Sequence, residues 1–327
     1  MSYIIRRAIF YLIAAWASIT LNFFLPRMMP GDPGSVLLAK LRGQGDIRPE
    51  TIEAMMKAYG VSDDPLIVQY FGYMRNILRG EFGVSTSWFP AAVSEVIRTG
   101  LIWTIILMGT ALLISFGIGS VLGVIGAWKR GSWMDNVTPP VFVFLGSLPY
   151  FWIAPLLLFA FAFHFNWFPA RHAYNTDLSP NFSWSFISSV IGHMILPVIS
   201  IVIVSIGGWL LGMRNTMIAI LSEDYVTMAE AKGLGSRRVM FGYGARNAML
   251  PTLTSFGMSL GFILSGSLFT EMVFAYPGLG YLLISSVRNL DYPLMQGLFM
   301  MITFAVLIAN FIIDILYVRL DPRIREG

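Results

Sequence analysis

The sequence contains no cysteine and little charge. Without cysteine the chain can form no disulfide and no thiolate zinc or iron–sulfur site. Asp, Glu, Lys and Arg make up only 12% of the 327 residues, against roughly a quarter in an ordinary soluble domain. A water-soluble globule is therefore a poor fit, and the net charge of +4 is a weak argument for binding nucleic acid.

The charges are also unevenly placed, because six uncharged stretches together cover about half the chain. Each stretch can hold the roughly 20 residues that a helix needs to cross a bilayer. We therefore expect an all-α polytopic membrane protein with six transmembrane helices, and not a barrel of alternating strands. The stretches are Ala8–Pro26, Thr99–Trp128, Asn136–Ala170, Leu178–Met213, Asn247–Thr270 and Tyr292–Ile313.

The Lys and Arg residues of the short loops predict the orientation, because cytoplasmic loops carry an excess of them. With the N-terminus inside, the inside segments hold twelve such residues and the short outside loops hold only Arg171 and Arg288. The first span follows Arg6 and Arg7 with no small-residue cleavage pattern, so we expect a retained signal anchor. Both termini are thus predicted to be cytoplasmic.

The segment between the first two spans is long and electrically balanced, with eight basic and eight acidic residues in Arg27–Arg98. Pro49–Tyr59 suggests a short helix, and a second helix is expected from a cap at Asp64 to Gly80. The predicted organisation is an anchor helix over 1–26, an extracytoplasmic subdomain over 27–98, a five-helix transmembrane core over 99–318 and a cytoplasmic tail over 319–327.

Motifs for chemistry are missing. No Gly-x-x-x-x-Gly-Lys-Ser/Thr loop occurs, so this chain is not expected to bind ATP. Neither a Gly-x-Ser-x-Gly elbow nor a His-Glu-x-x-His helix is present. His164, His172 and His193 lack the spacing of metal ligands on one element, so structural or interfacial roles are favoured. We expect no catalytic residue, no metal site and no bound cofactor.

The most informative stretch is the inside loop 214–250. It predicts a helix that Ser222 or Asp224 caps and that Gly233 and Gly235 break, followed by a second, basic helix. The small residues Ala229 and Ala231 would offer a close-packing face to a soluble partner. The alternative is an ordinary connecting loop.

Four further features allow both a structural and a functional interpretation. Aromatic residues of the second outside loop form either an interfacial belt or a lining of the substrate path. Asp314 is expected to have a structural partner in a neighbouring helix or a second subunit, and Glu271 to anchor an outside loop. Recurrent glycines in the second and fifth spans favour close helix packing over a pore lining. These glycines are Gly117, Gly119, Gly123, Gly126, Gly257, Gly261 and Gly266.

Six short motifs give the sequence a family resemblance that covers nearly the whole chain. It resembles the inner-membrane permeases of ATP-binding-cassette (ABC) importers, in the first-permease type of the dipeptide, oligopeptide and nickel branch. One departure is that the importer signature begins Glu-Ala-Ala, whereas this chain has Ala229-Glu230-Ala231. The motifs are Pro30-Gly31-Asp32-Pro33, Gly80-Glu81-Phe82-Gly83-x-Ser85, the loop from Asp224 to Pro251, Glu271 to Gly280, Asp291-Tyr292-Pro293 with Gln296-Gly297, and Leu320-Asp321-Pro322-Arg323.

The resemblance implies a transport subunit in the plasma (inner) membrane of a prokaryote, and not an enzyme. Its expected partners are a homologous second permease, two cytoplasmic ATP-binding-cassette subunits that bind ATP and Mg²⁺, an extracytoplasmic substrate-binding protein and membrane lipid, with no nucleic acid. The inside loop would be a coupling helix seated on the ATPase, formed by Asp224, Tyr225, Ala229, Glu230, Ala231, Lys232, Gly233, Leu234, Gly235, Arg237 and Arg238. The substrate path or the contact with the binding protein would include Trp167, Phe168, Tyr174, Glu271 and Tyr276.

Import of di- or oligopeptides is the leading hypothesis for function. Nine Trp residues keep cellobiose and other cello-oligosaccharides open as substrates, because flat sugar faces stack on aromatic rings. Nickel is less favoured because there are only three His residues. An autonomous secondary transporter would need acids near the middle of the membrane, which these spans lack. An intramembrane enzyme is weakened by the missing catalytic motifs.

Overall fold

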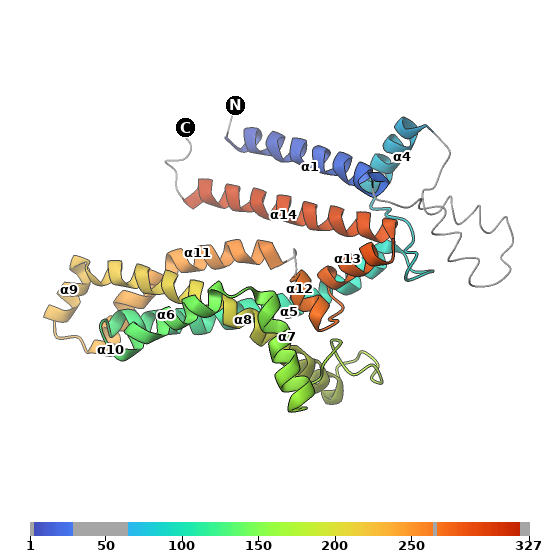
Figure 1. The fold of residues 1–327 in the computed structure, drawn as a ribbon. Helices are drawn as coiled ribbons and strands as arrows, with labels where there is room; N and C mark the ends of the chain where they lie inside the picture. Colours follow the sequence, from blue (N-terminus) through green and yellow to red (C-terminus); the bar gives the residue numbers. More distant parts are fainter. Residues whose placement is uncertain (1–2, 29–64, 264–266, 321–327) are drawn as a thin grey trace. The chain divides into compact units, whose positions relative to one another are not determined.

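The computed structural model describes residues 3–28, 65–263 and 267–320. Within these ranges the chain is helical and has no strand, apart from one isolated bridge between Val84 and Ala92. Figure 1 shows the helices in chain order. They are α1 (Tyr3–Met28), α4 (Leu66–Leu78), α5 (Val93–Trp128), α6 (Trp133–Ser147), α7 (Tyr150–Leu157), the π-helix η1 (Leu158–His164), α8 (Trp184–Leu221), α9 (Asp224–Ala231), α10 (Ser236–Arg238), the π-helix η2 (Val239–Ala245), α11 (Arg246–Phe262), α12 (Leu268–Val273), α13 (Leu279–Arg288) and α14 (Tyr292–Leu320).

Among the described residues, four helices are long and apolar enough to cross a membrane: α1, α5, α8 and α14. They correspond to the first, second, fourth and sixth predicted spans. Both α5, with 36 residues, and α8, with 38, exceed the roughly 20 residues that a bilayer requires. These helices confirm the prediction of an all-helical membrane protein.

The third predicted span is broken in two. Helix α6 and the segment Trp152–His164 are each too short to cross a membrane. Together they are long and apolar enough, and the chain bends by 100° between them. Leu148 has the extended ψ of 136°, because the ring of Pro149 disfavours helical geometry in the preceding residue. Pro149 therefore accounts for the bend in this span.

The fifth predicted span corresponds to α11, which has 17 residues. This helix is shorter than a typical span, and residues 264–266, which follow it closely, lie outside the described residues. The exact number of six transmembrane helices stays a prediction.

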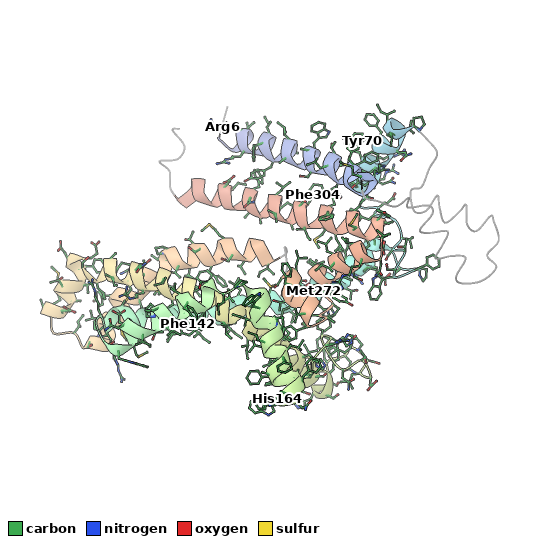
Figure 2. All side chains as sticks on the ribbon, in the orientation of Figure 1. Arg6, Tyr70, Phe142, His164, Met272 and Phe304 are labelled. Carbon is green, nitrogen blue, oxygen red and sulfur yellow. The ribbon has the colours of Figure 1, made fainter. Side chains whose placement is uncertain are left out.

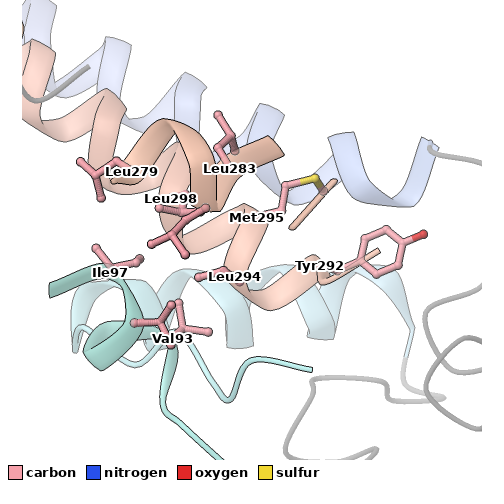
Figure 3. Packing of buried hydrophobic residues seen from close by; sticks show 10 residues of the cluster. Val93, Ile97, Leu279, Leu283, Tyr292, Leu294, Met295 and Leu298 are labelled. Carbon is pink, nitrogen blue, oxygen red and sulfur yellow. The ribbon is translucent and has the colours of Figure 1, made fainter. Parts of the chain in front are cut away.

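The chain divides into two compact units, and the first comprises Met1–Thr104, Leu264–Leu268 and Pro277–Gly327. Its core joins the first turns of α5 to α13 and to the start of α14 (Figure 3). Val93 lies very close to Gly297 of α14: a Cβ added at Gly297 would be only 2.5 Å from Cγ1 of Val93. The buried members are Val93, Val96, Ile97, Leu279, Leu282, Leu283, Tyr292, Leu294, Met295 and Leu298.

Two of the sequence motifs meet in the first unit. Ser85 donates a hydrogen bond from Oγ to Oδ2 of Asp291 (2.5 Å), and the backbone N–H of Ser87 donates to the same oxygen (2.9 Å). The other carboxylate oxygen accepts the N–H of Leu294 (3.2 Å), so Asp291 caps the N-terminus of α14. The buried Asp291 thus fixes the loop before α5 to the beginning of α14.

Helices α1 and α14 are also tied together by polar contacts. The Tyr11 hydroxyl donates to Oδ2 of Asp314 (2.7 Å), and Nε of Arg7 lies 3.4 Å from the same oxygen. Asp314 therefore has the structural partner in a neighbouring helix that was expected. Near the other end of α1, Nδ2 of Asn22 donates to the carbonyl of Gln296 in α14 (2.8 Å).

Helix α4 packs across the end of α1, and Figure 2 labels Tyr70 in this region. Pro65 takes the N-cap position and not the first helical turn, while Gly80 follows the helix with a positive φ of 74°. Burial raises the pKa of the Tyr73 phenol, which stays neutral and accepts a hydrogen bond from Asn22. Several predictions fall outside the described residues: the Pro30–Pro33 motif, helix Pro49–Tyr59, the cap Asp64 and the motif residues after Leu320.

The second unit comprises Ile105–Ile263 and Phe269–Tyr276. Small residues let α5 and α8 approach closely here: a Cβ at Gly119 would lie 2.9 Å from the carbonyl of Ile206, and one at Gly123 would lie 2.6 Å from that of Leu210. Two of the recurrent glycines are therefore packing residues. By contrast, Gly117 faces open space.

Candidate functional site

The predicted coupling loop folds as a short helix, α9, directly after α8. The predicted caps were wrong, because Glu223 takes the N-cap position without a side-chain bond. Ser222 instead donates its hydroxyl back to the carbonyl of Ala219 (2.7 Å), which satisfies the last turn of α8. Asp224 is the first residue of α9, where its negative charge suits the positive end of the helix dipole.

The C-terminus of α9 is a complete Schellman motif. Gly233 has a φ of +73°, its N–H donates to the carbonyl of Glu230 (2.8 Å), and the N–H of Leu234 donates to that of Ala229 (3.3 Å). This conformation favours glycine, since a Cβ strains the left-handed region. The predicted helix break at Gly233 therefore has a defined backbone geometry.

One face of α9 belongs to the core of the chain itself. Val226 and Ala229 are only 1% and 3% exposed, and they pack with Val239 against the partly buried Leu234. Trp128 at the end of α5 and Leu221 at the end of α8 also pack against this cluster. The expectation that Ala229 offers a face to a partner was wrong, because its side chain points into this core.

The opposite face of α9 is open. Asp224, Met228 and Ala231 are exposed, and their spacing of four and three residues places them on one stripe. Met228 alone is 59% exposed. We call these three residues the outer stripe of α9; the remaining predicted coupling residues that are exposed beside it are Tyr225, Glu230, Lys232, Gly233, Gly235, Arg237 and Arg238.

A hydrogen-bond relay fixes α9 to the beginning of α11. Nδ2 of Asn247 donates to the Tyr225 hydroxyl (3.2 Å) and to the carbonyl of Tyr243 (2.8 Å). Tyr243 lies in η2, which continues without a break from α10 into α11. The predicted separate basic helix is thus α10, the π-helix η2 and the beginning of α11 in series. π-helical turns are frequent at functional sites, so the presence of η2 supports a functional role for this region.

An ion pair that sequence reasoning did not predict lies in the same unit. Arg214 in α8 donates from Nε to Oδ1 of Asp135 in α6 (2.5 Å) and from Nη2 to Oδ2 (3.0 Å). The N–H of Gly131 adds a third bond to this carboxylate (3.0 Å). The Asp135 side chain is 4% exposed and that of Arg214 is 22% exposed. Such a bidentate pair fixes the orientation of both helices.

The predicted outside aromatic residues differ in their burial and in their ring partners. Trp167 is 64% exposed and stacks on Phe165, with ring centroids 5.0 Å apart. Tyr174 is partly buried beside Phe186, at 5.0 Å. Phe168 is also partly buried. These positions fit a belt at the membrane surface as well as a substrate path.

Glu271 and Tyr276 lie inside the protein. Both side chains are fully buried, and the N–H of Tyr276 donates to the carbonyl of Glu271 (2.8 Å). The neighbouring carbonyl of Phe274 accepts the N–H of His172 from the second outside loop (3.0 Å). This packing favours the anchoring interpretation of Glu271 over contact with a substrate. Within the described ranges no group of three or more His, Asp or Glu residues could hold a metal ion.

Residues 119–326 match the family of inner membrane components of binding-protein-dependent transport systems. The chain belongs to this family. The match includes the whole of α9 with its Schellman motif, the Asp135–Arg214 pair and the end of α5. The resemblance inferred from short motifs is therefore confirmed, and the chain is a permease component of an ABC importer.

Relatives of similar length support the same family. The di/tripeptide transport system permease protein DppB of Pseudomonas aeruginosa is 33% identical, with 100% of this chain and 99% of the relative covered. The oligopeptide transport system permease protein AppB of Bacillus subtilis is 32% identical, with 99% of each covered. The dipeptide transport system permease protein DppB of Escherichia coli K12 is 31% identical, with 100% and 99% covered.

Proposed function

We propose that this permease forms half of the translocation path for di- and oligopeptides. The observation that carries the proposal is that relatives named for di/tripeptide, oligopeptide and dipeptide transport align over essentially their full lengths. Oligosaccharides, nickel and an autonomous secondary transporter are not favoured by these relatives. Their names all specify peptides, and the family depends on a binding protein.

The partners follow from the family description. We expect a homologous second permease, two ATP-binding-cassette subunits and an extracytoplasmic binding protein. ATP and Mg²⁺ would be held by the cassette subunits. The distribution of Lys and Arg supports cytoplasmic termini and six spans, so α9 would face the cytoplasm.

The geometry of α9 suits the transmission of motion. Its outer stripe would sit on the ATPase, while Val226 and Ala229 join it to the ends of α5 and α8. A helix packed on both sides moves as a rigid body with the long helices to which it is attached. Closure of the ATPases on ATP would then tilt α5 and α8, and the Asp135–Arg214 pair would carry α6 with them.

The experiment is uptake into proteoliposomes that contain the complete importer and its binding protein. Labelled dipeptide, a longer peptide, cellobiose and Ni²⁺ would be compared with and without internal ATP. We expect ATP-dependent uptake of at least one peptide class and neither cellobiose nor Ni²⁺. Uptake of cellobiose or Ni²⁺ without peptide uptake would overturn the proposed substrate, and uptake by this chain alone would overturn the proposed machinery.

A further inference from the structure

Helix α4 uses polar groups to bind α1. The hydroxyls of Tyr70 and Thr20 form a hydrogen bond (2.8 Å), and Nδ2 of Asn22 donates to the Tyr73 hydroxyl (3.0 Å). Ile77, on the same face, is 7% exposed. Tyr70, Tyr73 and Ile77 thus define the buried face of α4, through which it contacts α1.

A second stripe of α4 is apolar and exposed. Ile67, Phe71 and Leu78 are 67%, 62% and 78% exposed, and their spacing of four and seven residues places them on one edge of the helix. Asn76 is exposed on the other side, and the exposed Arg75, four residues after Phe71, lies beside the stripe. A helix in a water-filled subdomain would not leave three large apolar side chains in one row, because such rows mark an interface.

The contacts with α1 set the level at which α4 lies. The part of α1 that is long and apolar enough to span a membrane is Ile5–Phe24. Helix α4 contacts Thr20 and Asn22 inside this part, and Gln69 accepts a hydrogen bond from Arg27, just beyond it (3.0 Å). α4 therefore lies where the hydrocarbon layer ends and the headgroups begin.

Aromatic rings connect the exposed stripe of α4 to the exposed side of α1. Phe24 of α1, which is 45% exposed, contacts Phe23; Phe23 contacts Tyr70; and Tyr70 contacts Phe71 of α4. The centroid distances are 5.2, 5.3 and 5.6 Å. Aromatic residues collect at the membrane surface. This row makes the apolar edge of α4 continuous with a side chain that a spanning helix exposes.

Charge completes the pattern. The Arg27 guanidinium lies over the Phe23 ring, 3.6 Å from its centroid, Arg75 is exposed beside the apolar stripe, and Arg79 is exposed just after α4. A helix with an apolar edge and a basic polar side lies in the plane of the bilayer surface. Guanidinium groups pair well with lipid phosphates.

We propose that α4 is an interfacial helix, with Ile67, Phe71 and Leu78 against lipid acyl chains and its arginines at the phosphates. This changes the predicted organisation, because part of segment 27–98 then belongs to the membrane surface and not to a water-exposed subdomain. The proposal depends on the proposed function in one respect: the orientation given there places α4 at the outer leaflet.

The absence of cysteine from this chain lets a fluorophore be attached at one chosen position before the complete importer is assembled. Single variants Phe71→Cys and Leu78→Cys, with Asn76→Cys as a control on the same helix, would be labelled with an environment-sensitive fluorophore and placed in lipid nanodiscs. Quenching by nitroxide-labelled lipid and by aqueous iodide would be measured for each. Two variants on the stripe keep the test valid if one of them fails to assemble.

The expected result is blue-shifted emission, strong quenching by lipid nitroxide and little quenching by iodide at positions 71 and 78, with the reverse at 76. Iodide quenching at 71 and 78 equal to that at 76 would overturn the proposal in favour of a water-exposed helix. Protection from both quenchers would overturn it in favour of a protein partner such as the second permease. This measurement involves no substrate, so the proposed function stands even if the quenching result overturns the interfacial helix. A failure of peptide uptake would likewise leave the interfacial helix standing.

Discussion

The Arg214 guanidinium holds the Asp135 carboxylate through two hydrogen bonds, 2.5 Å and 3.0 Å long. The two residues are 79 positions apart in the chain. This ion pair joins the first turn of α6 to α8, two turns before α8 leads into α9. The position makes it a structural support for the coupling region.

Breaking this pair should destabilise the protein. Asp135→Ala leaves the partly exposed Arg214 guanidinium without its carboxylate, which should cost about 1–3 kcal/mol. The double variant Asp135→Ala/Arg214→Ala should lose less than the sum of the single losses, because it leaves neither charge alone. Unfolding in mixed micelles measures these free energies, with the exposed Asp177→Ala as the control. Additive losses would show that the pair contributes nothing.

Two glycines near the end of α9 make a matched test of the Schellman motif. A Cβ at either Gly233 or Gly235 would meet nothing within 4 Å, but only Gly233 has a positive φ. Gly233→Ala should therefore cost about 1–2 kcal/mol of backbone strain and weaken substrate-stimulated ATPase activity. Gly235→Ala should leave that activity nearly unchanged, and Gly233→Asn should restore part of it, since Asn tolerates this conformation. Equal activities for both alanine variants would show that the left-handed turn is not needed.

The close contact between α5 and α8 gives a third prediction. Gly123→Ala would place a Cβ 2.6 Å from the carbonyl of Leu210, so the backbone must shift, and overpacking of this kind costs about 1–3 kcal/mol. Gly117→Ala, on the same helix, enters open space and should cost little. Thermal unfolding of the two purified variants compares them directly. A loss of stability in Gly117→Ala as large as that in Gly123→Ala would contradict the packing.

Local features of this structure could be predicted from the sequence. The long uncharged stretches predicted α1, α5, α8 and α14 because the bilayer requires such lengths. Gly233 marked the end of α9 because few other residues adopt its backbone conformation. Pro149 marked the break after α6 because it restricts Leu148.

Contacts between distant residues could not be predicted in the same way. Asp135 and Arg214, or Ser85 and Asp291 at 206 positions apart, share no local pattern that links them. The direction of Ala229 was missed for a different reason. Ala229 and Ala231 are two positions apart and therefore lie on nearly opposite sides of the helix. Composition alone does not say which of them faces the core.

The central claim is that the outer stripe of α9 couples ATP hydrolysis to peptide uptake. Ala231→Glu places a charge on this stripe, whereas Ala229→Glu places one in the core beneath it. In proteoliposomes with the complete importer, Ala231→Glu should insert and unfold like the wild type but lose ATP-driven uptake of labelled dipeptide. Ala229→Glu should lose stability first. Wild-type uptake by the Ala231→Glu importer would contradict the account.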